Sequence, residues 1–176
     1  MIATLRSFDA DWLALGRDAG FRFARERGSF VSYDGAGCIN IAPDDELDDD
    51  DWLGQIVVHE LCHHLVMGEA SRYAPDWGLE NMDERDVYLE HAALRVQAWL
   101  ADRFDLRDAL VATTDFRPWY EALGPDPLAS SPDDPSVAPA LAGVDNLMRW
   151  HHFGALEALL ARVRDAVVAT AGTPHR

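Results

Sequence analysis

His59-Glu60-Leu61-Cys62-His63 is the stretch of sequence that decides the fold prediction. Side chains four positions apart on a helix share one face, so the imidazoles of His59 and His63 can bind the same metal ion. Glu60 then lies beside that ion without being one of its ligands. The motif therefore predicts a helix that carries a mononuclear metal site, with Glu60 as the candidate catalytic residue.

The sequence around the motif is typical of a helix over residues 51–67. Its apolar residues recur at helical spacing, and the acidic run Asp48–Asp51 lies where a helix N-terminus favours negative charge. Gly68 is expected to end this helix one turn after the motif. Residues 37–43 alternate like a short strand that is closed by a proline, and we expect an edge strand beside the site.

A third ligand must come from elsewhere in the chain, because two histidines leave a metal ion under-coordinated. Residues 83–104 predict a second long helix, and Glu90 lies at the edge of its apolar stripe, where a carboxylate can turn toward the first helix. Glu84 and Asp86 compete for this role. Acidic residues in the first turn of a helix are explained by the helix dipole alone, so we expect Glu90 to complete the site.

Burial gives an independent reason to expect a metal. Two histidines and a glutamate follow the apolar stretch Gln55-Ile56-Val57-Val58, and polar side chains are costly to bury unless something compensates them. A bound cation provides that compensation.

Further positions extend the pattern beyond the motif: Gly68, Arg72, the turn Asp76-Trp77-Gly78, Glu90, Gln97, Ala98 and Trp99. With the motif, they resemble the elongation factor P hydroxylase family, a group of iron-dependent protein hydroxylases with a site similar to that of HExxH metallopeptidases. The resemblance implies that the two motif histidines and Glu90 hold the metal. The segment between Gly78 and Glu90 is shorter than in that family, and Leu79-Glu80-Asn81-Met82 replaces its tyrosine-rich stretch.

A His-His-Glu site is compatible with two chemistries. With Fe²⁺ it leaves positions open for dioxygen and supports hydroxylation, as the resemblance implies. With Zn²⁺ it polarises a water molecule, and Glu60 would act as the general base of a gluzincin-like peptidase or other hydrolase. We expect hydroxylase-like ancestry, with the zinc hydrolase as the alternative. A non-catalytic zinc-binding module fits less well, because structural zinc sites are usually closed by four ligands and rich in cysteine.

Composition limits the remaining possibilities. A chain of 176 residues with 48% hydrophobic content can bury one core, so residues 1–176 are expected to form a single metalloenzyme domain. The expected fold is mostly α with a small β element, an α+β frame for a zincin-like pair of helices. No signal peptide is apparent at the start of the sequence, which favours the cytoplasm and free thiols at Cys38 and Cys62.

The net charge of −16 and the pI near 4.6 argue against nucleic acid and anionic membranes as partners, because both attract basic surfaces. A basic peptide or protein substrate would be attracted instead.

Other segments give weaker signals. Helices are expected over residues 9–27, 141–152 and 155–171, and the proline-rich residues 124–139 read as a loop that is either a mobile excursion or a lid. Several side chains are possible proton donors near the site: His91, His151, His152, Tyr73, Tyr88 and Tyr120. Three aromatic residues could line a pocket, but we expect them to pack in the core: Trp77, Trp119 and Tyr120.

Overall fold

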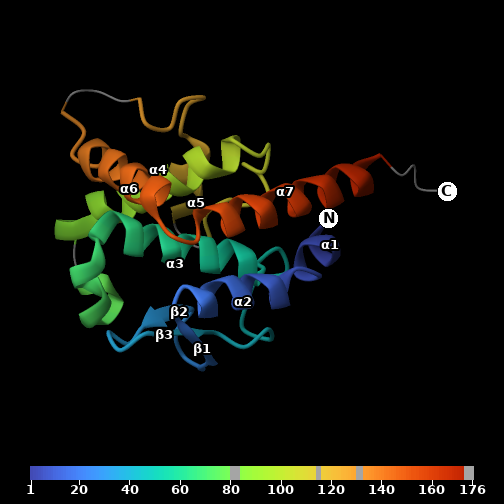
Figure 1. Cartoon of the computed structure of the whole chain (residues 1–176), viewed down its shortest axis with the longest axis horizontal. Helices are drawn as coiled ribbons and strands as arrows, with labels where there is room; N and C mark the ends of the chain where they lie inside the picture. The colour runs from blue at the N-terminus through green and yellow to red at the C-terminus, as the bar shows by residue number, and fades with distance from the viewer. Residues whose placement is uncertain (80–83, 114–115, 130–132, 173–176) are drawn as a thin grey trace.

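The described chain is mostly helical with one small three-stranded sheet, as the sequence predicts (Figure 1). The computed structural model describes residues 1–79, 84–113, 116–129 and 133–172. In chain order the elements are α1 (Ile2–Arg6), α2 (Asp9–Asp18), β1 (Arg22–Arg25), β2 (Val31–Tyr33), β3 (Cys38–Ile41), α3 (Leu53–Met67), the 3₁₀ helices η1 (Glu69–Tyr73), η2 (Pro75–Gly78) and η3 (Glu84–Asp86), then α4 (Val87–Asp102), α5 (Arg117–Glu121), α6 (Val137–Arg149) and α7 (Phe153–Ala171).

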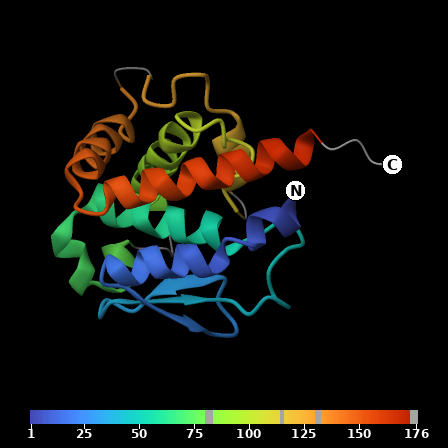
Figure 2. The same ribbon diagram turned by 45° about the vertical axis from the view of Figure 1, so that its right-hand side comes forward.

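Helix α3, which carries the motif, is the central element. It packs against α4 and α6 on one side and against α2 on the other, and the sheet lies beyond α2 and α3 (Figures 1 and 2). Its apolar residues are buried on almost every side of the helix, which explains why its sequence shows so little polar surface. The two terminal helices, α1 and α7, lie next to each other, and the hydroxyls of Thr4 and Thr170 are 3.1 Å apart.

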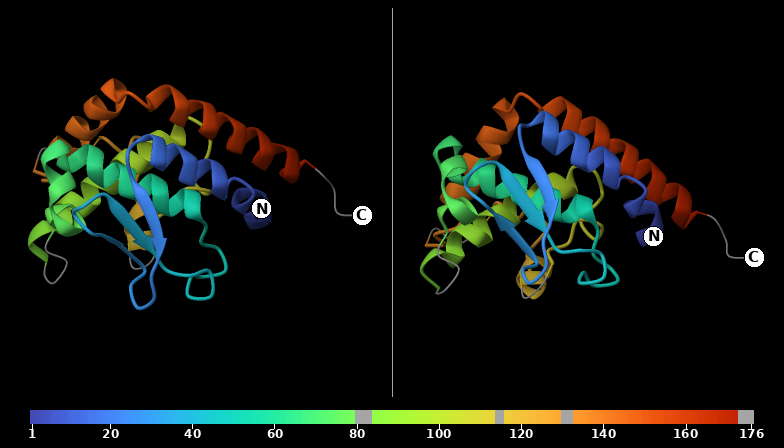
Figure 3. Two further views of the ribbon diagram at one scale, coloured as in Figure 1. Left: turned by 60° about the horizontal axis from the view of Figure 1, so that its bottom comes forward. Right: turned by 90° about the horizontal axis from the view of Figure 1, so that it is seen from below.

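The sheet corrects one expectation from the sequence. Strand β3 is the central strand rather than an edge strand, because it pairs in parallel with β1 and antiparallel with β2 (Figure 3). Pairing with β1 reaches Arg25 opposite Ile41, so Pro43 follows the last paired residue and does not interrupt the ladder. The edge position beside the site belongs to β2.

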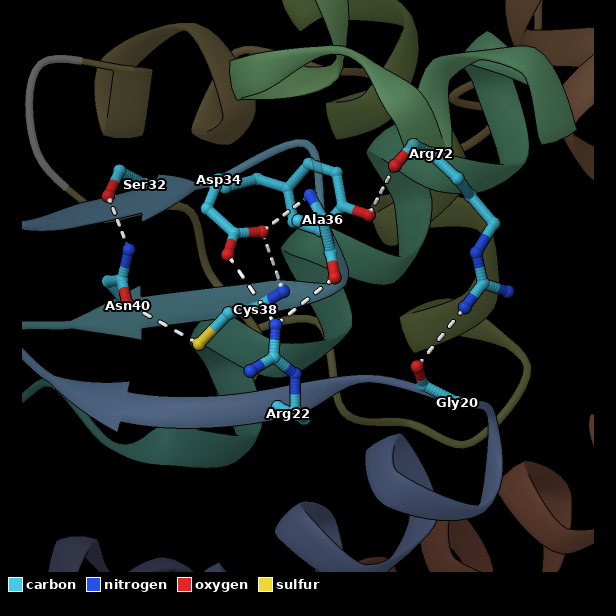
Figure 4. Close-up of polar contacts among 9 residues, drawn as sticks. Gly20, Arg22, Ser32, Asp34, Ala36, Cys38, Asn40 and Arg72 are labelled. Atoms are coloured by element: carbon cyan, nitrogen blue, oxygen red, sulfur yellow. Dashed lines mark hydrogen bonds and ion pairs between the residues drawn. The ribbon is translucent and has the colours of Figure 1, made fainter.

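Polar side chains fix the connection between β2 and β3 (Figure 4). The carboxylate of Asp34 accepts hydrogen bonds from the backbone N–H groups of Ala36 and Cys38, at 2.7 and 2.8 Å. Gly35 and Gly37 have positive φ angles of 69° and 92°, which glycine adopts without strain. The hairpin is therefore held by an Asp-centred turn of the kind that short polar side chains stabilise.

The predicted helix over residues 9–27 is wrong after Asp18. The chain turns at Gly20, where φ is 87°, and continues as strand β1. The side chain of Phe21 is buried against Tyr33 and Trp77, so tertiary packing overrides the helical pattern at this point.

The other predicted helices form with shifted ends. Residues 51–67 become α3, which begins at Leu53, and residues 83–104 become η3 and α4; Asp83 lies outside the described residues. The two C-terminal helices begin earlier than expected, at Val137 and Phe153.

The proline-rich loop is anchored where the structure describes it. Arg95 of α4 is buried, and its guanidinium donates hydrogen bonds to Ser136 Oγ, Pro127 O and Asp134 Oδ2 at 2.5 to 2.7 Å. The last residues of the predicted loop, 137–139, belong to α6. Pro139 is tolerated there because it lies in the first turn of the helix, where a backbone N–H would have no partner within the helix. Residues 130–132 lie outside the described residues.

In the part of the chain that the structure describes, no helix combines the length and the apolar character needed to cross a membrane.

Candidate metal centre

Packing of α3 against α4 brings His59, His63 and Glu90 together. The two imidazole Nε2 atoms are 3.0 Å apart, and each faces one oxygen of the Glu90 carboxylate, at 2.9 Å from His59 and 3.1 Å from His63. The sequence-predicted third ligand thus lies with the two histidines. Asp86 is not part of this group, and the side chain of Glu84 lies outside the described residues.

A buried glutamine determines which nitrogen of His59 faces the group. The amide nitrogen of Gln97 donates to the carbonyl oxygen of Leu110 at 2.8 Å, so its Oε1 remains as the acceptor for His59 Nδ1, at 2.9 Å. His59 must therefore carry a hydrogen on Nδ1, and its neutral form presents a lone pair at Nε2. This is the arrangement that metal-binding histidines commonly have.

The electrostatics of the three groups fit a bound cation. Burial lowers the pKa of His59, but the charge and hydrogen bond of Glu90, the charge of Glu60 and the hydrogen bond to Gln97 together outweigh it and raise that pKa to about 9. Burial raises the pKa of Glu90, and the two imidazoles more than reverse this, so that its pKa lies well below the usual range. The carboxylate is thus held ionised between two imidazoles, and the Nε2 and oxygen donors converge on one point. Two imidazoles and a carboxylate are a donor set that Fe²⁺ and Zn²⁺ both accept.

Glu60 lies beside these ligands and has a partner of its own. It is 4% exposed, and its Oε2 accepts a hydrogen bond of 2.8 Å from the indole N–H of Trp77. The indole stacks on the ring of Tyr33, with centroids 3.9 Å apart and planes 3° from parallel. Trp77 therefore lines the cavity and binds Glu60, the pocket alternative to the expected core packing. The sequence pattern included the turn Asp76-Trp77-Gly78, but it gave no indication that Trp77 binds Glu60.

The turn that presents Trp77 has an unusual backbone. Asp76 and Trp77 have φ angles of 45° and 60°, the left-handed region that residues other than glycine rarely adopt. Such conformations cost about 1–3 kcal/mol each and persist only where the surroundings fix them. Here the Asp76 carboxylate accepts the backbone N–H of Tyr33 at 3.0 Å, and Tyr33 stacks on Trp77. The strained turn is therefore tied to the edge strand β2.

The three groups line a cavity of about 230 Å³ between β2, α3, α4 and the segment before α5. Among the described residues that line it, the charged side chains other than the two histidines are all acidic: Glu60, Asp76 and Glu90. Its apolar wall consists of Phe30, Val31, Trp77, Leu79, Leu94, Ala112 and Phe116. A ligand in this cavity meets negative charge and apolar surface.

The other possible proton donors lie elsewhere. His91 stacks on Trp119 at 3.8 Å and is not among the residues that line the metal cavity, and neither is Tyr88. Tyr73 is exposed, and Tyr120 is buried beside a different cavity. His151 and His152 line a third cavity with the C-terminal end of α3.

No family model, curated protein or solved structure matches this chain.

Proposed function

We propose that this chain is a mononuclear metalloenzyme that uses Fe²⁺ to hydroxylate a side chain of a peptide or protein. The observation that carries the proposal is the convergence of His59, His63 and Glu90 at one point of a cavity. Two histidines and one carboxylate form the facial set of non-haem iron oxygenases, which leaves positions on the ion for dioxygen and substrate.

The residues of this chain have separate tasks in this proposal. His59, His63 and Glu90 hold the ion, and Gln97 fixes the tautomer and ring orientation of His59. Glu60, held by Trp77, orients substrate or ligands from the side of the cavity. The acidic lining and the net charge of −16 favour a neutral or basic substrate side chain.

Zinc-dependent hydrolysis is the second candidate function. The observation in its favour is that Glu60 lines the same cavity as the three ligands, where a general base would act on a metal-polarised water. A closed structural zinc site is less well supported, because the group found among the described residues has three members rather than four.

The compartment is part of the proposal as well. Cys38 and Cys62 are both free and buried, which suits a reducing compartment such as the cytoplasm.

Metal analysis of protein purified without added metal is the decisive experiment. Stoichiometric iron, with oxygen consumption that depends on a peptide substrate, is the expected result. Stoichiometric zinc with cleavage of peptides would replace the hydroxylase by the hydrolase. If the protein bound neither iron nor zinc after each ion had been added back, the metalloenzyme proposal itself would be refuted.

A further inference from the structure

The cavity lined by His151 and His152 lies at the C-terminal end of α3, and the formal charge of its lining is positive, opposite in sign to that of the cavity lined by His59, His63 and Glu90. It measures about 450 Å³ and is bordered by the end of α2, the C-terminal end of α3, η1, the end of α6 and the start of α7. Its ionisable lining residues are Arg72, Arg149, His64, His151, His152 and Glu69. The lining thus has two guanidinium groups, three imidazoles and a single carboxylate, in a chain with 31 acidic and 15 basic residues.

Arg72 is held rigidly without a negative partner. Its guanidinium donates to the carbonyl oxygens of Ala19 and Gly20, at 3.5 and 3.2 Å, and lies 4.6 Å from the ring centroid of Phe21. Its own carbonyl oxygen accepts a 2.7 Å hydrogen bond from the Tyr33 hydroxyl, so the backbone is fixed too (Figure 4). Within the described parts of the chain, Arg72 forms no ion pair with a carboxylate.

The opposite wall adds a second arginine with spare donors. Arg149 is exposed and donates one bond of 3.1 Å to Asn146 Oδ1, and it also forms no ion pair with a described carboxylate. His151 and His152 line the same cavity, and His152 occupies the N-cap position of α7 without a side-chain cap hydrogen bond, at a helix end where the dipole favours negative charge.

His64 borders the cavity with a buried ring. His64 is 4% exposed, and its Nδ1 is buried without a hydrogen-bond partner among the described residues. Its Nε2 lies 3.6 Å from Glu69, whose side chain is 78% exposed.

Helix dipoles explain part of this cluster but not all of it. Arg149 and His64 lie in the last turns of α6 and α3, where positive charge is favourable. Arg72 is in a short 3₁₀ helix and gains nothing comparable. A rigid, unneutralised guanidinium beside a cavity is the usual means of binding phosphate or carboxylate, because the planar donors match both groups.

We propose that this cavity is a binding site for a small anion of two or more negative charges, of the phosphate or dicarboxylate type. Arg72 and Arg149 supply the charge, and His151 and His152 supply further donors. The site does not depend on the metal centre or on the proposed function.

The test measures binding of inorganic phosphate and of succinate to the metal-free full chain by calorimetry, at constant ionic strength set with sodium chloride. Arg72→Gln and Arg149→Gln are each expected to weaken binding by about tenfold, the usual effect of losing a charge-assisted hydrogen bond. Arg17→Gln is the matched control, since Arg17 is an exposed arginine of α2 that does not line the cavity. It removes the same charge and should leave binding unchanged.

Arg149→Gln keeps the test decisive if Arg72→Gln does not fold, because Arg149 is exposed. Histidine NMR signals give the location: phosphate should shift those of His151 and His152 and leave those of His59 and His63 unchanged. Tighter binding of phosphate than of succinate, or the reverse, shows whether the site takes a phosphate or a dicarboxylate ligand. Equal weakening by the control variant, shifts confined to the metal-site histidines, or no binding above the sodium chloride baseline would overturn the proposal.

Discussion

The indole N–H of Trp77 donates a hydrogen bond of 2.8 Å to Oε2 of Glu60, and both side chains are buried. One oxygen of Glu60 therefore has a hydrogen-bond partner, and the carboxylate has a fixed orientation in the cavity that His59, His63 and Glu90 also line. The strained turn at Asp76 and Trp77 and the stacking on Tyr33 hold the indole in place. Trp77 is thus a positioning residue for Glu60.

Trp77→Phe should retain the metal but lower turnover by about tenfold, the usual effect of losing a hydrogen-bond partner that orients a residue beside a metal site. It should also reduce the free energy of unfolding by about 1–3 kcal/mol, because it leaves a buried carboxylate oxygen unpaired. Kinetics at matched metal occupancy and urea denaturation measure both effects. Trp99→Phe, on the half-buried side of α4, is the control. Unchanged turnover with full stability would show that the hydrogen bond has no positioning role.

Glu60→Gln separates the two candidate chemistries. In a hydrolase Glu60 is the general base, so the variant should keep its metal and lose roughly two to four orders of magnitude in rate. In a hydroxylase no water has to be deprotonated for attack, and the loss should be about 10- to 100-fold. Turnover of both proteins at equal metal content decides between them. Complete loss of turnover with the metal retained would contradict the preferred hydroxylase.

His59→Ala, His63→Ala and Glu90→Ala should each weaken metal binding by about a hundredfold or more, because a two-ligand site remains. Metal content after dialysis and competition with a chromophoric chelator give the affinity. Glu84→Ala is the control and should retain full occupancy. If Glu84→Ala lost the metal and Glu90→Ala kept it, the third ligand would be misassigned.

Arg95→Met should release the proline-rich loop. The buried guanidinium holds Pro127, Asp134 and Ser136, so its loss leaves several polar groups unpaired and should destabilise the fold by more than about 2 kcal/mol. Limited proteolysis with mass spectrometry should show faster cleavage within residues 124–136 than in the wild type. Arg103→Met, on the half-exposed end of the same helix, should not change the pattern. A wild-type loop that is already cut as fast as the variant would show that this anchor does not order it.

Asp9 should make the unfolding free energy depend on pH. Burial raises its pKa from 3.8 to about 6, even though the backbone N–H of Leu53 at the start of α3 opposes the shift. The folded state therefore holds the proton more tightly than the unfolded state, and stability falls as pH rises from about 4 to about 6. Asp9→Asn removes this cost, so its stability relative to wild type should improve by about 1 kcal/mol between pH 4 and pH 7, allowing for solvent screening of a half-exposed group. An equal difference at both pH values would argue against the raised pKa.

The sequence by itself determined the helix that carries the motif and the position of Glu90. Both follow from apolar residues at helical spacing, a pattern contained within one segment, and the packing of two such stripes then brings Glu90 to His59 and His63. Free thiols at Cys38 and Cys62 and the mostly α class were likewise predictable from local pattern and composition.

Tertiary structure decided the features that join distant segments. The break after Asp18, the central place of β3, the bond from Trp77 to Glu60 and the anchoring of the proline-rich loop by Arg95 all depend on partners that lie far away in the sequence. Strand pairing and buried hydrogen bonds form only where the folded chain places a donor opposite an acceptor and excludes water. Local periodicity records which face of a segment is buried, but not which partner covers it.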